Sequence, residues 1–559
     1  MPSQIPTPNV PDRAAVPNLG DYAQGRAEYR VEVPPRFNPV VDIVDRWAAE
    51  DPEATALVSL GPDGAPVAEQ TAADLADDSR RAARALLELG VKKGDRVFVM
   101  LPRVPAWYSA MLGAMRIGAV PSPAPNQSMT RDIAYRIDRL EAVVAITDVA
   151  GAMKFPSGLL AGRRLCWTDG SEPPAGWSDY DAALAAAGEV PLPEDPTAAD
   201  DPLLVFFTSG TVSYPKMVQH RQSYALGHVG TARFWHDLRA GDRHWTISDT
   251  GWAKAAWGGM FGQWHERAAV VQVALGAPDP DLVLGIVAEH GITSFCAPPT
   301  IYRMLVHADF SAHDLSALRH CTSAGEPLNP EVIRAWREGT GVMVYDGYGQ
   351  TETTVLVANY RSMEVRPGSM GKPVPGYEIE VHDPDGRPEA TGVVGEIAVR
   401  ADPDDWPAGL FSGYYGDEEA TAAAIREGWY YTGDKAAVDA DGYFWFEGRS
   451  DDVITSSAYR IGPFEVESAL VEHSAVLEAA VVGKPDPERT EIVFAFVVLA
   501  NGAEGTPELV AELQDHVKST TAPYKYPRGI AFVEDLPKTI SGKIRRGELR
   551  RRLQAGEGA

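Results

Sequence analysis

Residues 203–216 read Leu-Leu-Val-Phe-Phe-Thr-Ser-Gly-Thr-Val-Ser-Tyr-Pro-Lys, an apolar run that leads directly into a loop of hydroxyl side chains and a lysine. The apolar run predicts a short buried strand. Hydroxyls and backbone N–H groups can donate to phosphate oxygens, and Lys216 adds a positive charge. The loop lacks the G-x-x-x-x-G-K-[ST] pattern of P-loop NTPases. It is therefore either a phosphate site of another kind or an ordinary Ser/Thr-rich surface turn.

Composition limits the class of protein. The chain has 559 residues, too many for one hydrophobic core, so we expect at least two domains. Its 78 acidic and 51 basic residues give a net charge of −27, which argues against general binding to nucleic acid or anionic membranes. The widely spaced Cys166, Cys296 and Cys321 predict buried thiols in a reducing compartment. We see no apolar leader and no membrane-spanning run, so we expect a cytoplasmic protein.

The first two-thirds of the chain have the texture of an α/β protein. Residues 1–35 are rich in proline and predict an irregular arm along the surface. Helical and strand patterns then alternate over 40–190 and again over 280–345. For example, a helical pattern stops at Gly90 and is followed by an apolar strand at Arg96–Leu101. This alternation predicts layered α/β architecture.

The last third changes texture twice. From about residue 376 the pattern is that of a small antiparallel β region, with strands expected at Tyr377–His382 and Val394–Arg400. Near residue 450 it becomes a compact α+β domain. Its expected elements are strands at Val476–Val482 and Ile492–Leu499 around a loop at Gly483–Thr490, and a helix at Pro507–Lys518. We therefore predict an arm (1–35), a large N-terminal domain of layered α/β subdomains plus a small β region (36–450), and a small, mobile α+β C-terminal domain (451–559).

Four further segments carry suitable chemistry. Tyr348-Gly-Gln-Thr-Glu352 pairs a hydroxyl with a carboxylate that could bind Mg²⁺. Gly428-Trp-Tyr-Tyr-Thr-Gly-Asp434 places an acid after a turn, which suits a ribose diol. Gly448-Arg-Ser-Asp-Asp452 joins a cation to two acids at the expected domain junction, and Pro537-Lys-Thr-Ile-Ser-Gly-Lys543 ends in a lysine on a glycine turn. Singly, each also fits ordinary turn chemistry.

Together and in this order, these segments resemble the adenylate-forming acyl-CoA synthetase superfamily, and most closely its medium-chain (butyrate–CoA ligase) family. The likeness runs from about residue 35 to 550. The segments that carry it are Ser248–Lys254 (SDTGWAK), Ala324–Pro327 (AGEP), Tyr348–Thr353 (YGQTET), Tyr431–Asp434 (YTGD), Gly448–Val466 (GRSDDVITSSAYRIGPFEV), Thr521–Arg528 (TAPYKYPR) and Pro537–Arg546 (PKTISGKIRR).

The resemblance implies a reaction in two steps with ATP, Mg²⁺ and CoA. A carboxylate attacks the α-phosphate of ATP to give acyl-AMP and pyrophosphate, and the CoA thiol then displaces AMP. The first step brings two anions together, so cations must neutralise charge and hold the groups in line.

The resemblance also implies a role for each matching residue. In the catalytic set, Lys543 would reach the carboxylate and α-phosphate during adenylation only, Thr351 would contact the α-phosphate, Glu352 would bind the metal and Lys216 the outer phosphates. Asp451 would be the hinge about which the small domain turns. The implied ATP-binding residues are Thr208, Ser209, Gly210, Thr211, Val212, Ser213, Tyr214, Pro215, Lys216, Gly325, Glu326, Pro327, Asp346, Gly347, Tyr348, Gly349, Gln350, Thr351, Asp434, Arg449, Arg460 and Lys543. The implied CoA-binding residues are Ser457, Ala458, Tyr459, Arg489, Lys518 and Tyr526.

The acyl pocket is expected near Trp252 and Gly349. Acetate-specific synthetases carry a bulky Trp in the segment that matches Tyr348-Gly349, whereas Gly349 has no side chain. We therefore expect a deeper pocket that admits medium-chain, branched or aryl acids. Trp252 is either a wall of this pocket or a core residue, and the orientation of Lys254 is open.

Two positions depart from the family pattern. Ser213 stands in the phosphate loop where glycine is usual, and Ala458 stands in the CoA tunnel segment where glycine is usual. The added methyl of Ala458 predicts normal adenylation with weakened CoA use.

Two other functions remain open at this stage. The enzyme could pass the acyl group to a carrier protein or an amine, and Ala458 favours that alternative. A non-catalytic nucleotide-binding protein of the same fold is disfavoured, because Lys543, Glu352, Asp434 and Arg449 are all present.

Overall fold

The computed structural model describes residues 16–194, 197–208, 215–449, 452–456, 459–486, 489–500, 502–539 and 543–556, with only the backbone of Thr455, Tyr459 and Arg460. Several predicted site residues lie outside this range. They are Ser209, Gly210, Thr211, Val212, Ser213 and Tyr214 of the phosphate loop, the hinge Asp451, and Ser457 and Ala458.

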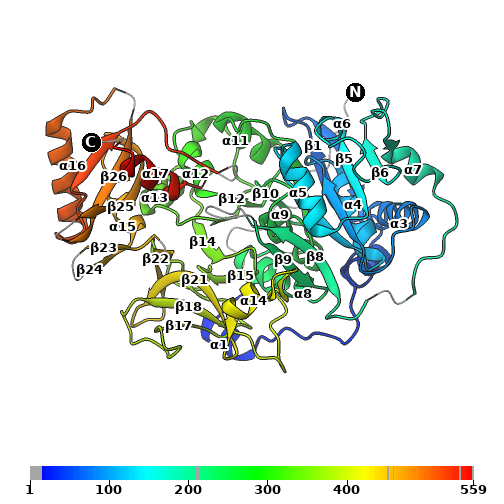
Figure 1. Cartoon of the computed structure of the whole chain (residues 1–559), viewed down its shortest axis with the longest axis horizontal. Helices are drawn as coiled ribbons and strands as arrows, with labels where there is room; N and C mark the ends of the chain where they lie inside the picture. The colour runs from blue at the N-terminus through cyan, green and yellow to red at the C-terminus, as the bar shows by residue number, and fades with distance from the viewer. Residues whose placement is uncertain are drawn as a thin grey trace.

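The largest sheet has nine strands and forms the middle of the large domain (Figure 1). Six neighbouring strands are parallel, with antiparallel strands at both edges. In spatial order the strands are β16 (Lys372–Pro373), β15 (Val355–Ala358), β14 (Val344–Gly349), β13 (His320–Ala324), β12 (Ser294–Ala297), β10 (Arg243–Thr246), β11 (Ala269–Val273), β1 (Thr55–Leu60) and β2 (Pro66–Thr71). The predicted α/β layering is confirmed here.

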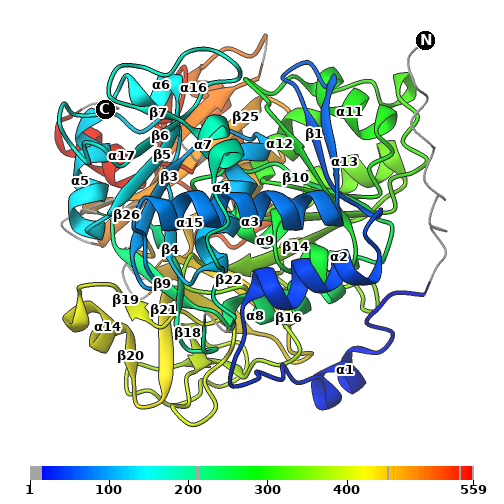
Figure 2. The same ribbon diagram turned by 90° about the vertical axis from the view of Figure 1, so that its right-hand side faces the viewer.

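A second sheet of five parallel strands carries the predicted strand at Arg96–Leu101. Its strands are β4 (Val120–Pro123), β3 (Arg96–Met100), β5 (Val144–Asp148), β6 (Arg164–Trp167) and β7 (Ser178–Asp179). Helices α3 (Ala72–Glu88) and α4 (Pro105–Arg116) pack on each other between the two sheets, and α3 crosses the front of the molecule in Figure 2. Helix α3 starts at a capping box of Thr71 and Asp74 and is followed by Gly90 at φ 78°, so the predicted stop signal is confirmed.

The remaining helices of the large domain cover the sheets or connect their strands. They are α1 (Tyr22–Glu28), η1 (Val40–Asp45), α2 (Arg46–Glu50), α5 (Thr130–Leu140), α6 (Val149–Ala152), α7 (Tyr180–Ala186), α8 (Tyr224–Gly230), η2 (Thr231–Trp235), α9 (Ala253–Gly259), α10 (Gly262–His265), α11 (Pro280–Glu289), α12 (Pro299–Leu305), η3 (Phe310–Ala312), α13 (Pro330–Thr340) and α14 (Glu418–Ala424). The arm was expected to be irregular, and α1 corrects this for Tyr22–Glu28. The Asp21 side chain caps the helix, and the Tyr22 hydroxyl ties it to the Pro373 carbonyl at 2.8 Å.

The large domain has two smaller sheets, one beside the predicted phosphate loop and one that forms the predicted β region. The first joins β19 (Gly413–Tyr414), β9 (Met217–Arg221) and β8 (Pro202–Phe207), so it carries both ends of the loop. The second contains β17 (Ile379–His382), β18 (Gly395–Arg400), β21 (Trp429–Val438), β20 (Ile425–Arg426) and β22 (Phe444–Arg449). The predicted antiparallel β region is confirmed.

The C-terminal residues form a separate α+β unit around their own buried cluster. Its sheet contains β24 (Tyr459–Ile461), β23 (Ile454–Ser456), β26 (Thr490–Leu499), β25 (Val476–Asp486) and β27 (Gly529–Phe532), and its helices are α15 (Pro463–Val471), α16 (Pro507–Thr520) and α17 (Arg546–Gln554). The predicted loop at Gly483–Thr490 was too long, because β25 and β26 stay paired as far as Asp486 and Thr490. A strand can extend through polar residues when its partner supplies the hydrogen bonds, and an apolar pattern does not reveal this.

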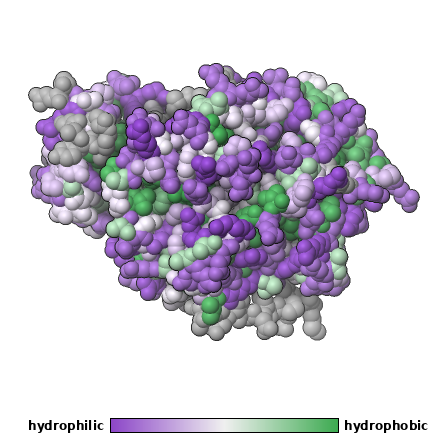
Figure 3. All heavy atoms as spheres, turned by 90° about the horizontal axis from the view of Figure 1, so that it is seen from below, coloured by the Kyte–Doolittle hydropathy of each residue, from purple (hydrophilic) through white to green (hydrophobic). Residues whose placement is uncertain are grey.

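The surface agrees with the acidic composition. Hydrophilic residues cover most of the face in Figure 3, and the green apolar residues form small separate groups. Among the described residues, no helix is both long and apolar enough to cross a bilayer. Cys166, Cys296 and Cys321 are buried, as predicted, and these three thiols form no disulfide with one another.

Candidate active site

The candidate site lies where the parallel strands of the large sheet end. Strands β11 and β12 lie on opposite sides of β10, so the chain leaves β10 in one direction and returns on the other side. Such a reversal opens a crevice at the carboxyl ends of the strands, and ligands bind there in open α/β sheets. Gly325, Glu326 and Pro327 follow β13, and Asp346, Gly347, Tyr348 and Gly349 end β14, so both predicted adenine segments reach this edge.

The described ends of the phosphate loop are held together at the start of β9. Thr208 N donates to the Lys216 carbonyl and Lys216 N to the Thr208 hydroxyl, both at 3.0 Å. The Lys216 ammonium lies 4.3 Å from the centre of the Tyr414 ring. Pro215 is described next to Lys216, and Tyr135 donates a long 3.5 Å hydrogen bond to its carbonyl.

The Thr351–Glu352 turn is fixed from several sides. His220 Nε2 lies 2.8 Å from the Thr351 carbonyl, and Phe411 N donates to the Glu352 carbonyl at 2.8 Å. Burial lowers the pKa of His220 to about 3, so the ring is neutral and Nε2–H is the donor. The Tyr414 hydroxyl donates to Glu352 Oε1 at 2.9 Å. Burial raises the pKa of Glu352, while Tyr414, Lys216 and Arg449 favour its charged form.

Asp434 is equally well fixed. Tyr348 Oη and Gln350 Nε2 donate to its Oδ2 at 2.7 Å and 2.6 Å. Arg449 lies opposite it on the paired strand β22, with Nη1 3.9 Å from Oδ1. Burial raises the pKa of Asp434, and Arg449 and the two hydrogen bonds oppose that rise. The sequence segments 348–350, 434 and 449 therefore meet at one carboxylate.

The predicted adenine segments combine an unusual backbone conformation at Gly325 with two carboxyl groups, those of Asp346 and Glu326. Gly325 has φ 117°, a conformation that only glycine adopts without strain. Burial raises the pKa of Asp346 to about 7, although Leu328 N and Gly347 N donate to its carboxyl at 3.3 Å and 3.0 Å. Arg303 holds Glu326 with a 3.0 Å ion pair.

Lys543 enters this cleft from the C-terminal domain. Thr539 N donates to the Lys543 carbonyl at 2.7 Å, Lys543 N donates to the Thr539 hydroxyl at 3.0 Å, and the Lys543 side chain is exposed to solvent. Surrounding protein atoms lower the pKa of Lys543, and the nearby acids Glu326 and Asp434 oppose this. Arg449 lowers the pKa of Lys543 further, and Glu352 raises it. Lys543 of the C-terminal domain therefore lies within electrostatic range of these four charged residues of the large domain.

The predicted acyl wall differs from expectation at Gly349. A Cβ at Gly349 would lie 2.6 Å from the Trp257 ring of α9 and 2.4 Å from the Thr354 carbonyl. The missing side chain therefore does not leave open space, because Trp257 fills it. Trp252 is half-buried at the start of α9. Lys254 points toward the strand ends and donates to the Ala324 carbonyl at 2.8 Å, and burial lowers its pKa.

The predicted CoA residues are only partly brought together. The Lys518 ammonium lies 4.5 Å from the centre of the Tyr526 ring, and Arg528 donates to the Tyr526 hydroxyl at 2.8 Å. Within the described part of the chain, no hydrogen bond, ion pair or ring contact joins Arg489 to these residues. Tyr459 and Arg460 are described by their backbone in β24 alone.

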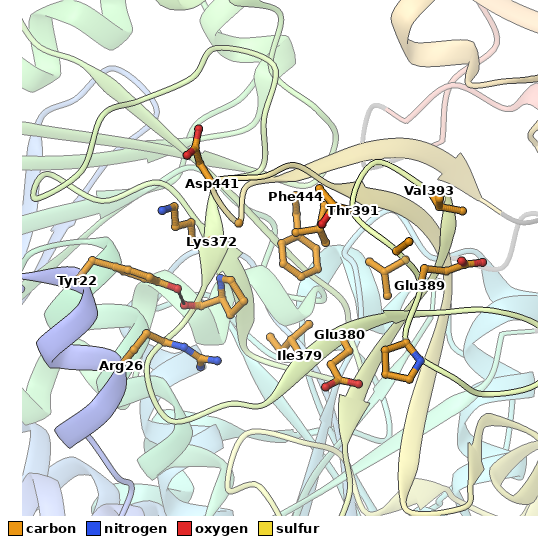
Figure 4. Close-up of a pocket in the computed structure, with 16 residues that line it drawn as sticks. Tyr22, Arg26, Lys372, Ile379, Glu380, Glu389, Thr391, Val393, Asp441 and Phe444 are labelled. Carbon is orange, nitrogen blue, oxygen red and sulfur yellow. Dashed lines mark hydrogen bonds between the residues drawn. The ribbon is translucent and has the colours of Figure 1, made fainter.

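A cavity of about 410 Å³ lies elsewhere, between α1 and the small β region (Figure 4). Tyr22, Arg26, Lys372, Glu380 and Glu389 are among its lining residues. Arg26 is occupied by the backbone carbonyls of Val374 and Tyr377. None of the predicted site residues lines this cavity, so its size does not make it the candidate active site.

Sequence reasoning missed three residues that shape the site: His220, Trp257 and Tyr414. His220 lies four residues beyond Lys216 on β9, and Tyr414 precedes a second tyrosine in an unremarkable Gly-Tyr-Tyr segment. Trp257 lies one helical turn beyond Ala253, and a Trp at that spacing is usually a core residue. Their partners lie more than 60 residues away, so no local signal could have identified them.

Comparison with known families agrees with this geometry. Residues 44–415 match the family described as AMP-binding enzyme, and residues 465–543 match the AMP-binding enzyme C-terminal domain. The mitochondrial acyl-coenzyme A synthetase ACSM3 of Rattus norvegicus is 41% identical over 552 residues, covering 97% of this chain and 95% of the relative.

Solved structures show the same fold. An anthranilate CoA ligase, AuaEII, in complex with anthranoyl-AMP superposes with a TM-score of 0.85 at 29% identity, covering 94% of this chain and 99% of the other. An acyl-CoA synthetase of Brucella canis gives a TM-score of 0.73 at 36% identity, covering 96% and 99%.

Proposed function

Because this chain belongs to the AMP-binding enzyme family and is an acyl-CoA synthetase that forms acyl-CoA through acyl-AMP, we propose that the residues described above carry the two steps. The observation that carries this assignment is that Lys543 of the C-terminal domain lies within electrostatic range of Glu326, Asp434, Arg449 and Glu352 of the large domain. A lysine near Asp434, the proposed ribose contact, and near Glu352, the proposed metal ligand, suits the adenylation step.

In adenylation, Lys543 would neutralise charge between the attacking carboxylate and the α-phosphate. Lys216 and the loop Thr208–Lys216 would bind the outer phosphates, and Thr351 would contact the α-phosphate. Asp434 and Arg449 would hold the ribose. Asp434 and Glu352 are held by hydrogen bonds from neighbouring elements before substrate arrives, so little reorganisation of these two groups is needed when charge moves to the leaving pyrophosphate.

We assign Glu352 as the protein ligand of Mg²⁺. No group of three or more metal-ligating side chains occurs in the described part of the chain. This fits Mg²⁺, which commonly binds one or two carboxylates and completes its shell with substrate phosphates and water. The ion would supply charge neutralisation on the triphosphate. Glu352 would hold the ion, and Lys216, whose ammonium lies over the Tyr414 ring, would bind the outer phosphates.

The second step needs the small domain to turn about Asp451, so that Lys543 leaves and the Ser457–Tyr459 segment approaches. Lys518, Tyr526 and Arg489 would then contact CoA. The orientation of the C-terminal domain in this structure suits adenylation, because Lys543 lies within electrostatic range of Asp434 and Glu352. Domain turning of this kind can limit the turnover of an enzyme.

We propose that the acid is medium-chain, branched or aryl. Trp257, which packs against Gly349, would close the far end of the acyl pocket, and Trp252 would form a side wall. A pocket with apolar walls separates neighbouring chain lengths by only about 1–3 kcal/mol per methylene. Such an enzyme should therefore accept several related acids. The three buried, reduced cysteines favour a cytoplasmic site of action, which fractionation can test.

The decisive experiment is pyrophosphate release across C2–C12, branched and aromatic acids, with and without CoA. We expect a maximum among the medium-chain or aryl acids and acyl-CoA as the product. The variant Trp257→Leu should move the maximum toward longer acids. A maximum at acetate in both proteins would contradict this pocket assignment, and acyl-AMP that CoA never consumes would contradict the assigned second step.

A further inference from the structure

Tyr414 is the side chain that contacts both charged residues assigned to the metal and the phosphates. Its hydroxyl donates to Glu352 Oε1 at 2.9 Å. Its ring faces the Lys216 ammonium at 4.3 Å from the ring centre. The ring is buried and packs edge-on against Phe411, with 5.0 Å between ring centres, so it has little freedom to move.

The backbone explains why Tyr414 reaches this position. Strand β19 pairs antiparallel with β9, with Tyr414 opposite Val218. Ser412 N donates to the Gln219 carbonyl at 2.8 Å, and Tyr415 N to the Met217 carbonyl at 2.7 Å. Two hydrogen bonds therefore flank Tyr414 and place it beside the strand that begins next to Lys216.

Tyr414 also keeps its two neighbours apart. Glu352 and Lys216 lie close enough for the charge of Lys216 to act on the Glu352 carboxyl. Both are described residues, yet no ion pair within 4.0 Å joins them. A direct pair would have to break before a metal–nucleotide complex could bind. The Tyr414 hydroxyl and ring face instead satisfy each charge separately, since an aromatic face attracts an ammonium ion.

We propose that Tyr414 is a positioning residue for the metal–nucleotide complex, holding the Glu352 carboxylate and the Lys216 ammonium apart and aimed at their ligands. This inference rests on the proposed roles of Glu352 and Lys216. It adds a residue to which no role was assigned from the sequence. Removal of a group that orients a metal ligand typically lowers metal affinity by about tenfold to 100-fold.

Two substitutions separate the functions of the hydroxyl and the ring. Tyr414→Phe removes the hydrogen bond to Glu352 but keeps the ring under Lys216. Tyr414→Leu removes both. Tyr415→Phe is the matched control, because the hydroxyl of this neighbouring tyrosine donates to Glu141 at 3.0 Å on an exposed part of the surface.

The readout is binding rather than turnover. Mn²⁺ binding in the presence of a non-hydrolysable ATP analogue is followed by electron paramagnetic resonance, and binding of the metal-free analogue by calorimetry. We expect Tyr414→Phe to weaken Mn²⁺ binding about tenfold and to leave metal-free nucleotide binding unchanged. Tyr414→Leu should weaken both, and Tyr415→Phe neither. Thermal unfolding of each variant checks that the fold is retained.

A Glu352→Gln variant separates failure of this inference from failure of the metal assignment. If Glu352→Gln leaves Mn²⁺ binding unchanged, Glu352 is not the metal ligand. If Glu352→Gln weakens it while Tyr414→Phe does not, Glu352 keeps its role and Tyr414 has none. In the double variant, we expect Tyr414→Phe to cause no further loss, because its target carboxylate is already gone.

Discussion

The two domains supply their site residues in opposite ways. In the large domain, Asp434 and Glu352 are only 5% and 9% exposed, and each has hydrogen-bond donors fixed by neighbouring strands. In the C-terminal domain, the Lys543 side chain is exposed, and no hydrogen bond or ion pair to a described residue holds its ammonium. With the roles proposed above, the nucleotide wall would be built in advance, whereas Lys543 would be delivered by the position of the C-terminal domain.

The difference matches the demands of the two steps. The ribose and the metal–phosphate group are needed at the same place throughout adenylation, so rigid support costs nothing. A lysine needed in only one step must be able to leave, and strong contacts around its ammonium would oppose its departure. The interface between the domains is correspondingly polar. Arg303 of α12 lies 3.9 Å from Glu478 of β25, and Glu447 of β22 faces Glu465 of α15.

Removing the Lys543 ammonium should have the largest effect. We expect Lys543→Ala to slow acyl-AMP formation by about 100-fold to 1,000-fold, because a group that stabilises developing charge is lost. Conversion of preformed acyl-AMP and CoA to acyl-CoA should stay near the wild-type rate. Lys538→Ala, which removes a lysine of the same segment that pairs with Glu478, is the control. An equal loss in both half-reactions would mean that Lys543 does not serve adenylation alone.

Disturbing Asp434 in the large domain should have a smaller effect, and this effect should fall on the KM for ATP. We expect Asp434→Asn to raise the KM for ATP by about tenfold to 100-fold, since a charge-assisted hydrogen bond to the nucleotide is weakened. The KM for the acid should hardly change. Asp441→Asn, on the same β region but paired with Arg366 at the surface, serves as the control. An unchanged KM for ATP in Asp434→Asn would contradict the assignment of Asp434 to the ribose.

The carboxyl pair at the interface predicts a pH dependence. Burial, and then the charge of Glu465, raises the pKa of Glu447 from 4.5 to about 8, while Lys525, which pairs with Glu465, opposes the rise. The folded protein thus binds a proton that the unfolded chain releases, so this contribution is complete below about pH 4.5 and is lost as the pH rises to about 8.

Glu447→Gln should remove that pH dependence, because glutamine resembles the protonated acid. Above pH 8 we expect its melting temperature to exceed that of the wild type by about 2–4 °C, and below pH 5 to match it. Thermal unfolding between pH 5 and 9 measures the difference, with Glu504→Gln on an exposed loop of the C-terminal domain as the control. Parallel curves for Glu447→Gln and the wild type would show that the pair does not take up a proton.

The smallest effect is expected in the CoA tunnel segment. Ala458→Gly removes one methyl from the expected path of pantetheine and should improve kcat/KM for CoA by less than about tenfold. The rate of pyrophosphate release without CoA should not change. Equal CoA kinetics in the two proteins would show that the methyl causes no obstruction.

Much of the fold could be predicted from the sequence alone, and the sequence also supplied the candidate site residues. The loop beginning at Thr208, the Thr351–Glu352 pair, Asp434, Arg449 and Lys543 occupy short motifs whose residue types and order carry the information. Helix and strand positions in the large domain follow from local apolar periodicity. Such signals were weaker where polar residues continue a strand, as in the β25–β26 pair.

Only the tertiary structure decided which side chains support the site residues. His220 reaches Thr351 and Tyr414 reaches Glu352 because β9 and β19 pair across nearly 200 residues of chain. Likewise, Trp257 takes up the space beside Gly349, so the absence of a side chain there does not measure the depth of the pocket. A motif specifies the chemistry of a group within a few residues. Its orientation, its neighbours and the empty space around it depend on close packing between distant segments, which no local pattern encodes.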